Sequence, residues 1–134
     1  MTIKIPAILL LFFGFVACDN PPKNELTGTW KLLSYCQPGG TITCNQVIVP
    51  TDKGVFISFS RNSQFNETYQ NTLPKDYSFL GCGGGSYEIE NKNVRIRAVC
   101  MSSSNGRLFE IVSLSSKRLI LKPNGMGEYV FEKQ

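Results

Sequence analysis

Short stretches in which apolar and polar residues alternate recur along the chain from residue 26 onward, separated by clusters of glycine, asparagine, serine and proline. Val94, Ile96 and Ala98, for example, alternate with Arg95 and Arg97. A two-residue period is typical of a strand with one buried face. The pattern predicts eight strands, at 28–35, 54–60, 64–70, 85–90, 93–100, 107–113, 117–122 and 127–133.

Most of the predicted connections are short, as at 61–63, 91–92, 114–116 and 123–126. Connections of this length join neighbouring antiparallel strands and cannot serve parallel crossovers. Closing the sheet on itself removes the exposed edges that an open sheet would leave. The pattern therefore favours an all-β fold, an eight-stranded antiparallel up-and-down barrel. A two-sheet sandwich is the alternative, although it would need longer connections between its sheets.

The inward faces of the predicted strands carry many aromatic residues. Glu67 is in phase with Phe65 and Tyr69, so we expect an inward carboxylate that needs a partner or a polar pocket. A stripe of inward aromatic residues is more often plain core than a ligand pocket, although an eight-stranded barrel has room for either. The candidate ligand-binding residues are Trp30, Phe59, Phe65, Glu67, Tyr69, Tyr87, Phe109 and Tyr129.

The start of the chain has the composition of an export signal. An apolar run from Ile5 to Val16 follows Lys4 and is too short for the roughly twenty residues that cross a bilayer. Residues 15–18, "FVAC", resemble a bacterial lipobox, which implies that Cys18 becomes the first mature residue and carries lipid. An ordinary secretory signal or an uncleaved anchor is the alternative.

These features divide the chain into a signal peptide at 1–17, a lipid-anchored tether at 18–25 and one barrel domain at 26–134. We expect the domain to lie in the cell envelope, attached to a bacterial membrane through Cys18. The outer membrane is favoured, with the domain facing the periplasm or the cell surface.

Four further cysteines predict two disulfides, because the expected compartment is oxidising and the spacings are not those of zinc ligands. Extending the register of the hairpin around residues 91–92 brings Cys82 close to Cys100. Cys36 is then left to pair with Cys44 across a loop that contains proline and glycine.

The absence of histidine narrows the functional classes. It removes the most common general base and the imidazole ligands of most zinc and copper sites. We therefore expect neither an enzyme, nor a metal site, nor a cofactor. The net charge of +4 is small and scattered along the chain, so we expect no nucleic-acid partner.

The segment "LTGTWKLLSYC" at 26–36 resembles the first-strand glycine-x-tryptophan motif of lipocalins, with Gly28 and Trp30 in the matching positions. The segments "FEIVSLSSKRLILK" at 109–122 and "GEYVFEKQ" at 127–134 resemble the last three strands of small bacterial lipocalin-like lipoproteins. The resemblance implies a lipocalin-like barrel closed at one end by Trp30. The arginine that packs on this tryptophan in lipocalins would be Arg118.

Two functions follow from these observations. The first is a membrane-anchored, monomeric lipocalin-like lipoprotein that binds a small apolar ligand inside its barrel. The alternative is an extracytoplasmic protein-interaction module, of the protease-inhibitor or adhesion type. It would use the long loops at 37–53 and 71–84, since long loops on a rigid scaffold often carry function.

Overall fold

The structure is a computed structural model, and it describes residues 23–38, 44–125 and 127–134. The predictions for the signal peptide, for Cys18 and for most of the tether lie outside the described residues. No helix within these three ranges is long and apolar enough to cross a membrane. In chain order the elements are α1 (Lys23–Leu26), β1 (Gly28–Pro38), β2 (Cys44–Ile48), β3 (Gly54–Phe59), β4 (Gln64–Gln70), β5 (Gly84–Glu90), β6 (Asn93–Ala98), β7 (Arg107–Leu114), β8 (Arg118–Pro123) and β9 (Tyr129–Lys133).

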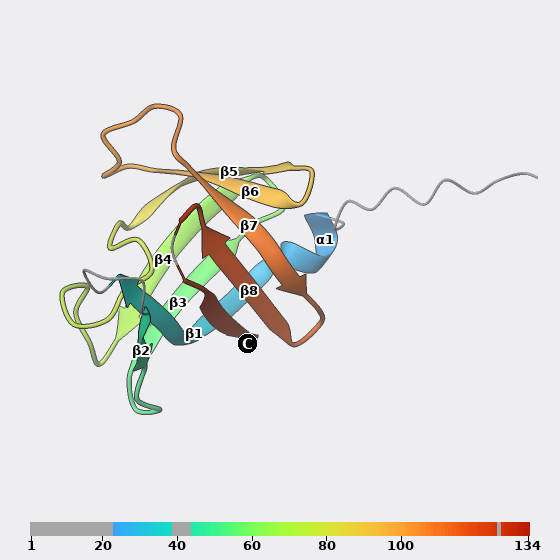
Figure 1. Ribbon diagram of the computed structural model, residues 1–134. Coiled ribbons are helices and arrows are strands. Elements are labelled where there is room, and N and C mark those ends of the chain that lie inside the picture. Colours follow the sequence, from blue (N-terminus) through green and yellow to red (C-terminus); the bar gives the residue numbers. More distant parts are fainter. Residues whose placement is uncertain (1–22, 39–43, 126) are drawn as a thin grey trace, which may run out of the picture.

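Eight of the strands form a closed antiparallel barrel (Figure 1). From β3 onward each strand pairs with the next along the chain, and β9 pairs back with β1. β1 also pairs with β3, which completes the ring. The all-β, eight-stranded, up-and-down barrel predicted from the alternating pattern is therefore confirmed.

The ninth strand, β2, was not predicted. It lies within the segment 37–53, which was predicted to be a loop. It pairs with the second half of β1, from Ser34 opposite Ile48 to Pro38 opposite Cys44. β1 accordingly continues to Pro38 instead of ending at Tyr35. Most of β2 is exposed, so its sequence lacks the alternation that a half-buried strand would show.

Both predicted disulfides are confirmed, with the predicted pairing. Cys36 and Cys44 lie at the end of the β1–β2 hairpin, with their Cα atoms 5.3 Å apart. Cys82 and Cys100 flank the open end of the β5–β6 hairpin, with their Cα atoms 5.6 Å apart. β6 ends at Ala98, two residues earlier than predicted, because Val99 and Cys100 belong to the turn that follows.

One end of the barrel is closed by Trp30, which is fully buried. Its indole Nε1 donates a hydrogen bond to the carbonyl of Leu26 in α1 at 2.9 Å. The ammonium of Lys133 lies 4.4 Å from the centre of the indole ring, a cation–π contact, and donates to the carbonyl of Thr27 at 2.5 Å. Arg118, predicted for this position, is exposed and paired in register with Glu132.

The reason for this correction is the two-residue period of β9. Lys133 is in phase with the buried Phe131 and so points into the barrel. Arg118 is out of phase with the buried Leu119 on β8 and points to solvent. Burial lowers the pKa of Lys133 from its usual range.

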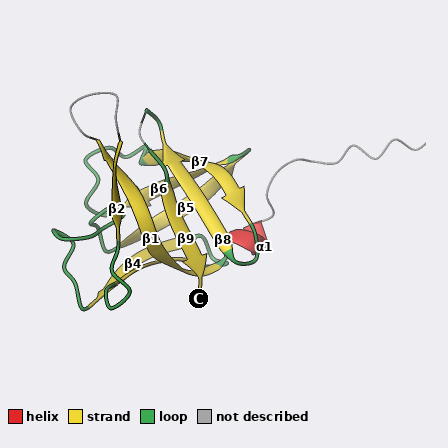
Figure 2. Ribbon diagram, turned by 60° about the horizontal axis from the view of Figure 1, so that its bottom comes forward, coloured by secondary structure: helices red, strands yellow, loops and turns green. Residues whose placement is uncertain are grey.

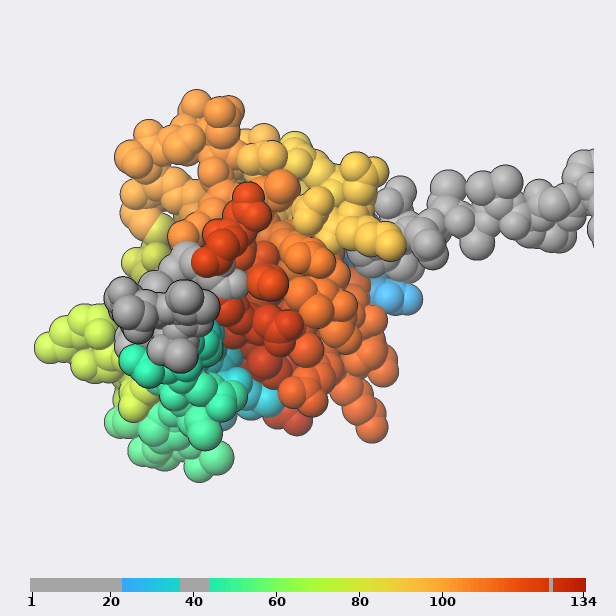
Figure 3. Space-filling view, in the orientation of Figure 1, coloured from blue at the N-terminus to red at the C-terminus, as the bar shows by residue number. Residues whose placement is uncertain are grey.

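The longer connections lie at the opposite, open end of the barrel. They are the β1–β2 hairpin end, the β4–β5 connection at 71–83 and the β6–β7 connection at 99–106. Figure 2 shows the end of β1 and the start of β2 on the side away from α1. In Figure 3 the connections 71–83 and 99–106 stand out from the barrel, again on the side away from α1.

Candidate ligand site at the open end of the barrel

The structure places all eight predicted ligand-binding residues in the barrel core or against it. Trp30, Phe59, Phe65, Tyr87 and Phe109 are at most 2% exposed. The other three are Glu67 and Tyr129, which are buried, and Tyr69, which packs against the core and is partly exposed.

These residues do not form a single site. Trp30, Phe59 and Tyr87 belong to the closed half of the barrel, where the rings of Phe59 and Tyr87 pack edge to face at 4.9 Å. The Tyr87 hydroxyl donates to the carbonyl of Ser60 at 2.6 Å. Phe65 is paired in register with Phe59, with the two ring centres 5.5 Å apart, so it borders the closed half. The open half holds the remaining four residues, so any ligand reaching the interior from the open end meets these first.

Phe79 was not predicted, and it fills the open half of the interior. Its side chain is 5% exposed although it belongs to the connection 71–83 and not to a strand. Its ring centre lies 4.9 Å from that of Phe109, 5.0 Å from that of Tyr129 and 5.3 Å from that of Phe131. The centre of the Phe65 ring lies 6.4 Å from that of Phe79, so four aromatic rings surround Phe79. Phe79 therefore acts as a plug that the chain supplies from a loop.

Glu67 holds the backbone of this plug. One carboxylate oxygen accepts hydrogen bonds from the Phe79 amide at 2.8 Å and from the Tyr69 hydroxyl at 2.6 Å. The other oxygen accepts from the Leu80 amide at 2.9 Å. Glu67 is 3% exposed, and it is the one buried charged side chain in the part of the chain that the structure describes.

A buried carboxylate is costly unless it is hydrogen-bonded, and these three donors meet that need. Tyr69 is a dependable donor, because burial and its hydrogen bond to Glu67 raise the pKa of its hydroxyl above the usual range. The expectation that Glu67 points inward and needs a polar partner is confirmed. Its partners are the Tyr69 hydroxyl and the backbone amides of residues 79–80.

A cation lies at the rim of the open end. Arg107 is in phase with Phe109 on β7 and is paired in register with the buried Ile96, so its side chain starts from the inner face of the sheet. Its guanidinium carbon lies 5.8 Å from the centre of the Phe109 ring. Burial raises the pKa of Tyr129, and the positive charge of Arg107 partly opposes that shift. Tyr129 in turn stacks on Tyr35 at 5.5 Å.

A surface pocket of about 350 Å³ opens beside the plug and this cation. It combines apolar groups with hydroxyls and one guanidinium. The residues that line it are Leu80, Cys82, Cys100, Met101, Ser102, Ser103, Gly106 and Arg107.

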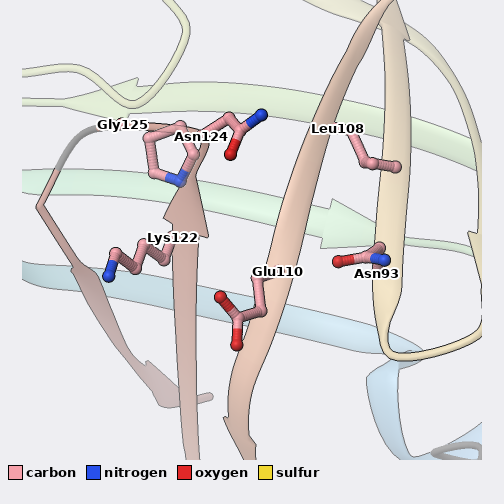
Figure 4. Close-up of a pocket in the computed structure, with 7 residues that line it drawn as sticks. Asn93, Leu108, Glu110, Lys122, Asn124 and Gly125 are labelled. Carbon is pink, nitrogen blue, oxygen red and sulfur yellow. The ribbon is translucent and has the colours of Figure 1, made fainter.

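A second pocket, of about 440 Å³, lies on the outside of the barrel (Figure 4). Glu110 and Lys122, on neighbouring strands, are paired in register and exposed. They alternate with the buried Phe109 and Leu121, so they face away from the interior. This outer pocket is therefore separate from the site at the open end. Within the described ranges, no group of three or more cysteine and acidic residues could hold a metal ion.

The fold and the closed end define the class of protein: an eight-stranded antiparallel barrel whose first strand carries a buried tryptophan after a glycine. Residues 26–121, well over half of the chain, match the model of the lipocalin-like domain family. The chain belongs to this family.

Two solved structures share the fold, each with a TM-score of 0.56. One is an uncharacterized protein from Bacteroides eggerthii DSM 20697, with 22% sequence identity over 81% of this chain and 99% of that one. The other is a lipocalin-like protein from Bacteroides uniformis ATCC 8492, with 18% identity over 82% of this chain and 99% of that one. No curated protein matches the chain.

Proposed function

We propose that this chain is a binding protein for a small apolar ligand, which reaches the barrel through its open end and takes the place of the Phe79 ring. The proposal rests on one observation: the ring of Phe79, which fills the open half of the interior, comes from a connection and not from a strand. A barrel whose strands alone filled its interior would leave no exchangeable part, whereas Phe79 belongs to a connection and can leave without breaking a strand pairing.

The energies of this exchange are comparable. Removing a buried phenylalanine side chain from a core costs about 3 to 5 kcal/mol. An aromatic ligand group that buries about 150 to 250 Å² regains about 4 to 6 kcal/mol at 25 cal/mol per Å². The exchange of one ring for another is thus close to neutral, and a ligand gains affinity from what it contacts beyond the ring.

We further propose that Cys18 is lipidated and anchors the protein in the cell envelope. The pairing of four cysteines in two disulfides supports an oxidising compartment. α1 begins at Lys23, at the closed end of the barrel. A lipid on Cys18 would therefore bind the closed end to the membrane and direct the open end away from it. Metabolic labelling with a palmitate analogue tests this: the chain should incorporate label, and Cys18→Ser should not.

Native mass spectrometry of the protein purified from the envelope tests the binding function. A discrete added mass that is lost on denaturation identifies the ligand class. Its yield should fall when Phe109→Ala removes a ring that faces the site, and it should persist in Val112→Ala, a control on the exposed face of the same strand. Absence of any added mass, together with no uptake of apolar compounds by the purified chain, would contradict the proposal.

A second candidate, protein interaction, is favoured by the exposed apolar side chains at the open end. Ile48, Leu73 and Val99 are 71%, 55% and 86% exposed. The loops predicted for this role are less free than expected, because part of 37–53 is strand β2 and part of 71–84 is the plug. Deleting 71–80 would disrupt the core, so Val99→Glu and Leu73→Glu are the better tests of partner capture by cross-linking.

A further inference from the structure

We propose that the ligand is a small aromatic carboxylate, whose ring replaces that of Phe79 and whose carboxylate binds Arg107 at the rim. This inference rests on the proposed binding function and specifies its ligand. It follows from three features of the open end: the fixed backbone of the plug, the arrangement of the surrounding rings and the position of the charges.

The plug's backbone limits the space that can open. The amides of Phe79 and Leu80 both bond to Glu67, and Cys82, two residues further on, is tied to Cys100. If this backbone moved away, the buried carboxylate would keep only the Tyr69 hydroxyl and lose two donors. The side chain of Phe79 is therefore the part that moves, and the vacated space is the size of one ring.

The walls of that space suit an aromatic ring. Around the Phe79 ring, the planes of Tyr129 and Phe131 are inclined by 80° and 86°, and those of Phe65 and Phe109 by 60° and 43°. Edge-to-face and tilted contacts of this kind are worth about 0.5 to 1.5 kcal/mol each beyond buried area. An aromatic ligand can reproduce them, and an aliphatic group of the same volume cannot.

The charged side chains at the open end determine whether the polar group of the ligand, opposite its ring, is an anion or a cation. Arg107 lies over Phe109, which touches the Phe79 ring, and it also lines the solvent-open pocket of about 350 Å³. An anion at the rim meets this guanidinium, and Ser102 and Ser103 line the same pocket. An anion deeper in the barrel would meet the carboxylate of Glu67. A ligand ammonium gains little from Glu67, whose oxygens already accept three hydrogen bonds, and it is repelled by Arg107.

Isothermal titration of the full-length protein in mild detergent tests this inference with three matched probes: phenylpropionate, phenylpropanol and phenylpropylamine. We expect the carboxylate to bind at least about tenfold more tightly than the alcohol, because a hydrogen bond to a charged group exceeds a neutral one by this amount. The amine should bind most weakly. Arg107→Gln should remove the preference for the carboxylate, so that the carboxylate and the alcohol bind with similar affinity.

Two further variants make the test decisive. Arg118→Gln, which removes an exposed cation outside the barrel, should behave as the original protein. Arg107→Lys keeps the charge and should retain part of the preference, which separates a loss of charge from a loss of folding. Equal binding of carboxylate and alcohol would overturn this inference and leave the proposed function standing. If none of the probes binds, either to the original protein or to Phe79→Ala, the proposed function fails as well.

Discussion

Glu67→Gln isolates the contribution of the carboxylate that holds the plug. The substitution keeps the size and shape of the side chain and removes its charge. The amide oxygen can replace the carboxylate oxygen that accepts from both Tyr69 and Phe79. The amide nitrogen then faces the Leu80 N–H, which donated to the other carboxylate oxygen at 2.9 Å, so two donors oppose each other.

The expected loss of stability follows from the number of hydrogen bonds that the substitution removes. A hydrogen bond to a charged group contributes about 1.5 to 3 kcal/mol, and a buried donor left without a partner costs about 1 to 3 kcal/mol. Because these two effects overlap at Leu80, we expect Glu67→Gln to lower the free energy of unfolding by about 2 to 4 kcal/mol. We also expect it to weaken the hold on residues 79–80, so that Phe79 leaves the interior more readily.

Urea unfolding followed by the fluorescence of Trp30, the single tryptophan, measures the first effect. Hydrogen exchange at the Phe79 and Leu80 amides measures the second, and both amides should exchange much faster than in the original protein. Glu110→Gln, on the exposed outer face, is the control and should change neither quantity. Unchanged stability with unchanged exchange at these two amides would refute the assigned role of Glu67.

Three other perturbations have defined outcomes. Phe79→Ala should lower the free energy of unfolding by about 3 to 5 kcal/mol and increase binding of an apolar fluorescent dye; a stable variant that binds no more dye would argue against the plug. Replacing Cys82 and Cys100 by serine should cost about 3 kcal/mol in urea unfolding, more than removal of the other disulfide, because this pair closes the longer loop, with a sequence separation of 18. Lys133 has a lowered pKa when folded, so the folded state binds fewer protons there than the unfolded chain does. The free energy of unfolding of the original protein, relative to that of Lys133→Met, should therefore rise as the pH rises toward 10.5, the unperturbed pKa of lysine. A fall over that range would contradict the lowered pKa of Lys133.

The barrel was predictable because its information is local. Most of its eight strands show the alternation that one buried face imposes, with shifts in register only in β1 and β7, and short connections leave the antiparallel order as the natural one. The register of one hairpin was enough to place Cys82 beside Cys100. The inward phase of Glu67 was equally visible, because it depends only on its neighbours in β4.

What the sequence concealed depends on tertiary contacts. β2 is exposed along most of its length, so no periodicity marked it. Phe79 stands in a connection without a two-residue period, so no strand pattern indicates that its ring enters the barrel. The pair "FL" at 79–80, apolar amid glycine and polar residues, is the one signal that could have drawn attention to it. The resemblance to lipocalins implied an arginine over Trp30, but the cation there is Lys133, more than one hundred residues further along the chain.

The origin of the plug bears on how relatives with this barrel can diverge. The hydrogen-bonded strands determine the frame, but a connecting segment determines how much of the interior is occupied. Connections tolerate substitution and changes of length better than strands do. A replacement at the single position 79 could therefore turn a filled barrel into a hollow one, or suit it to a different occupant, without altering any strand pairing. In this protein the surface connection 71–83, which can vary between relatives, also determines the shape of the barrel interior.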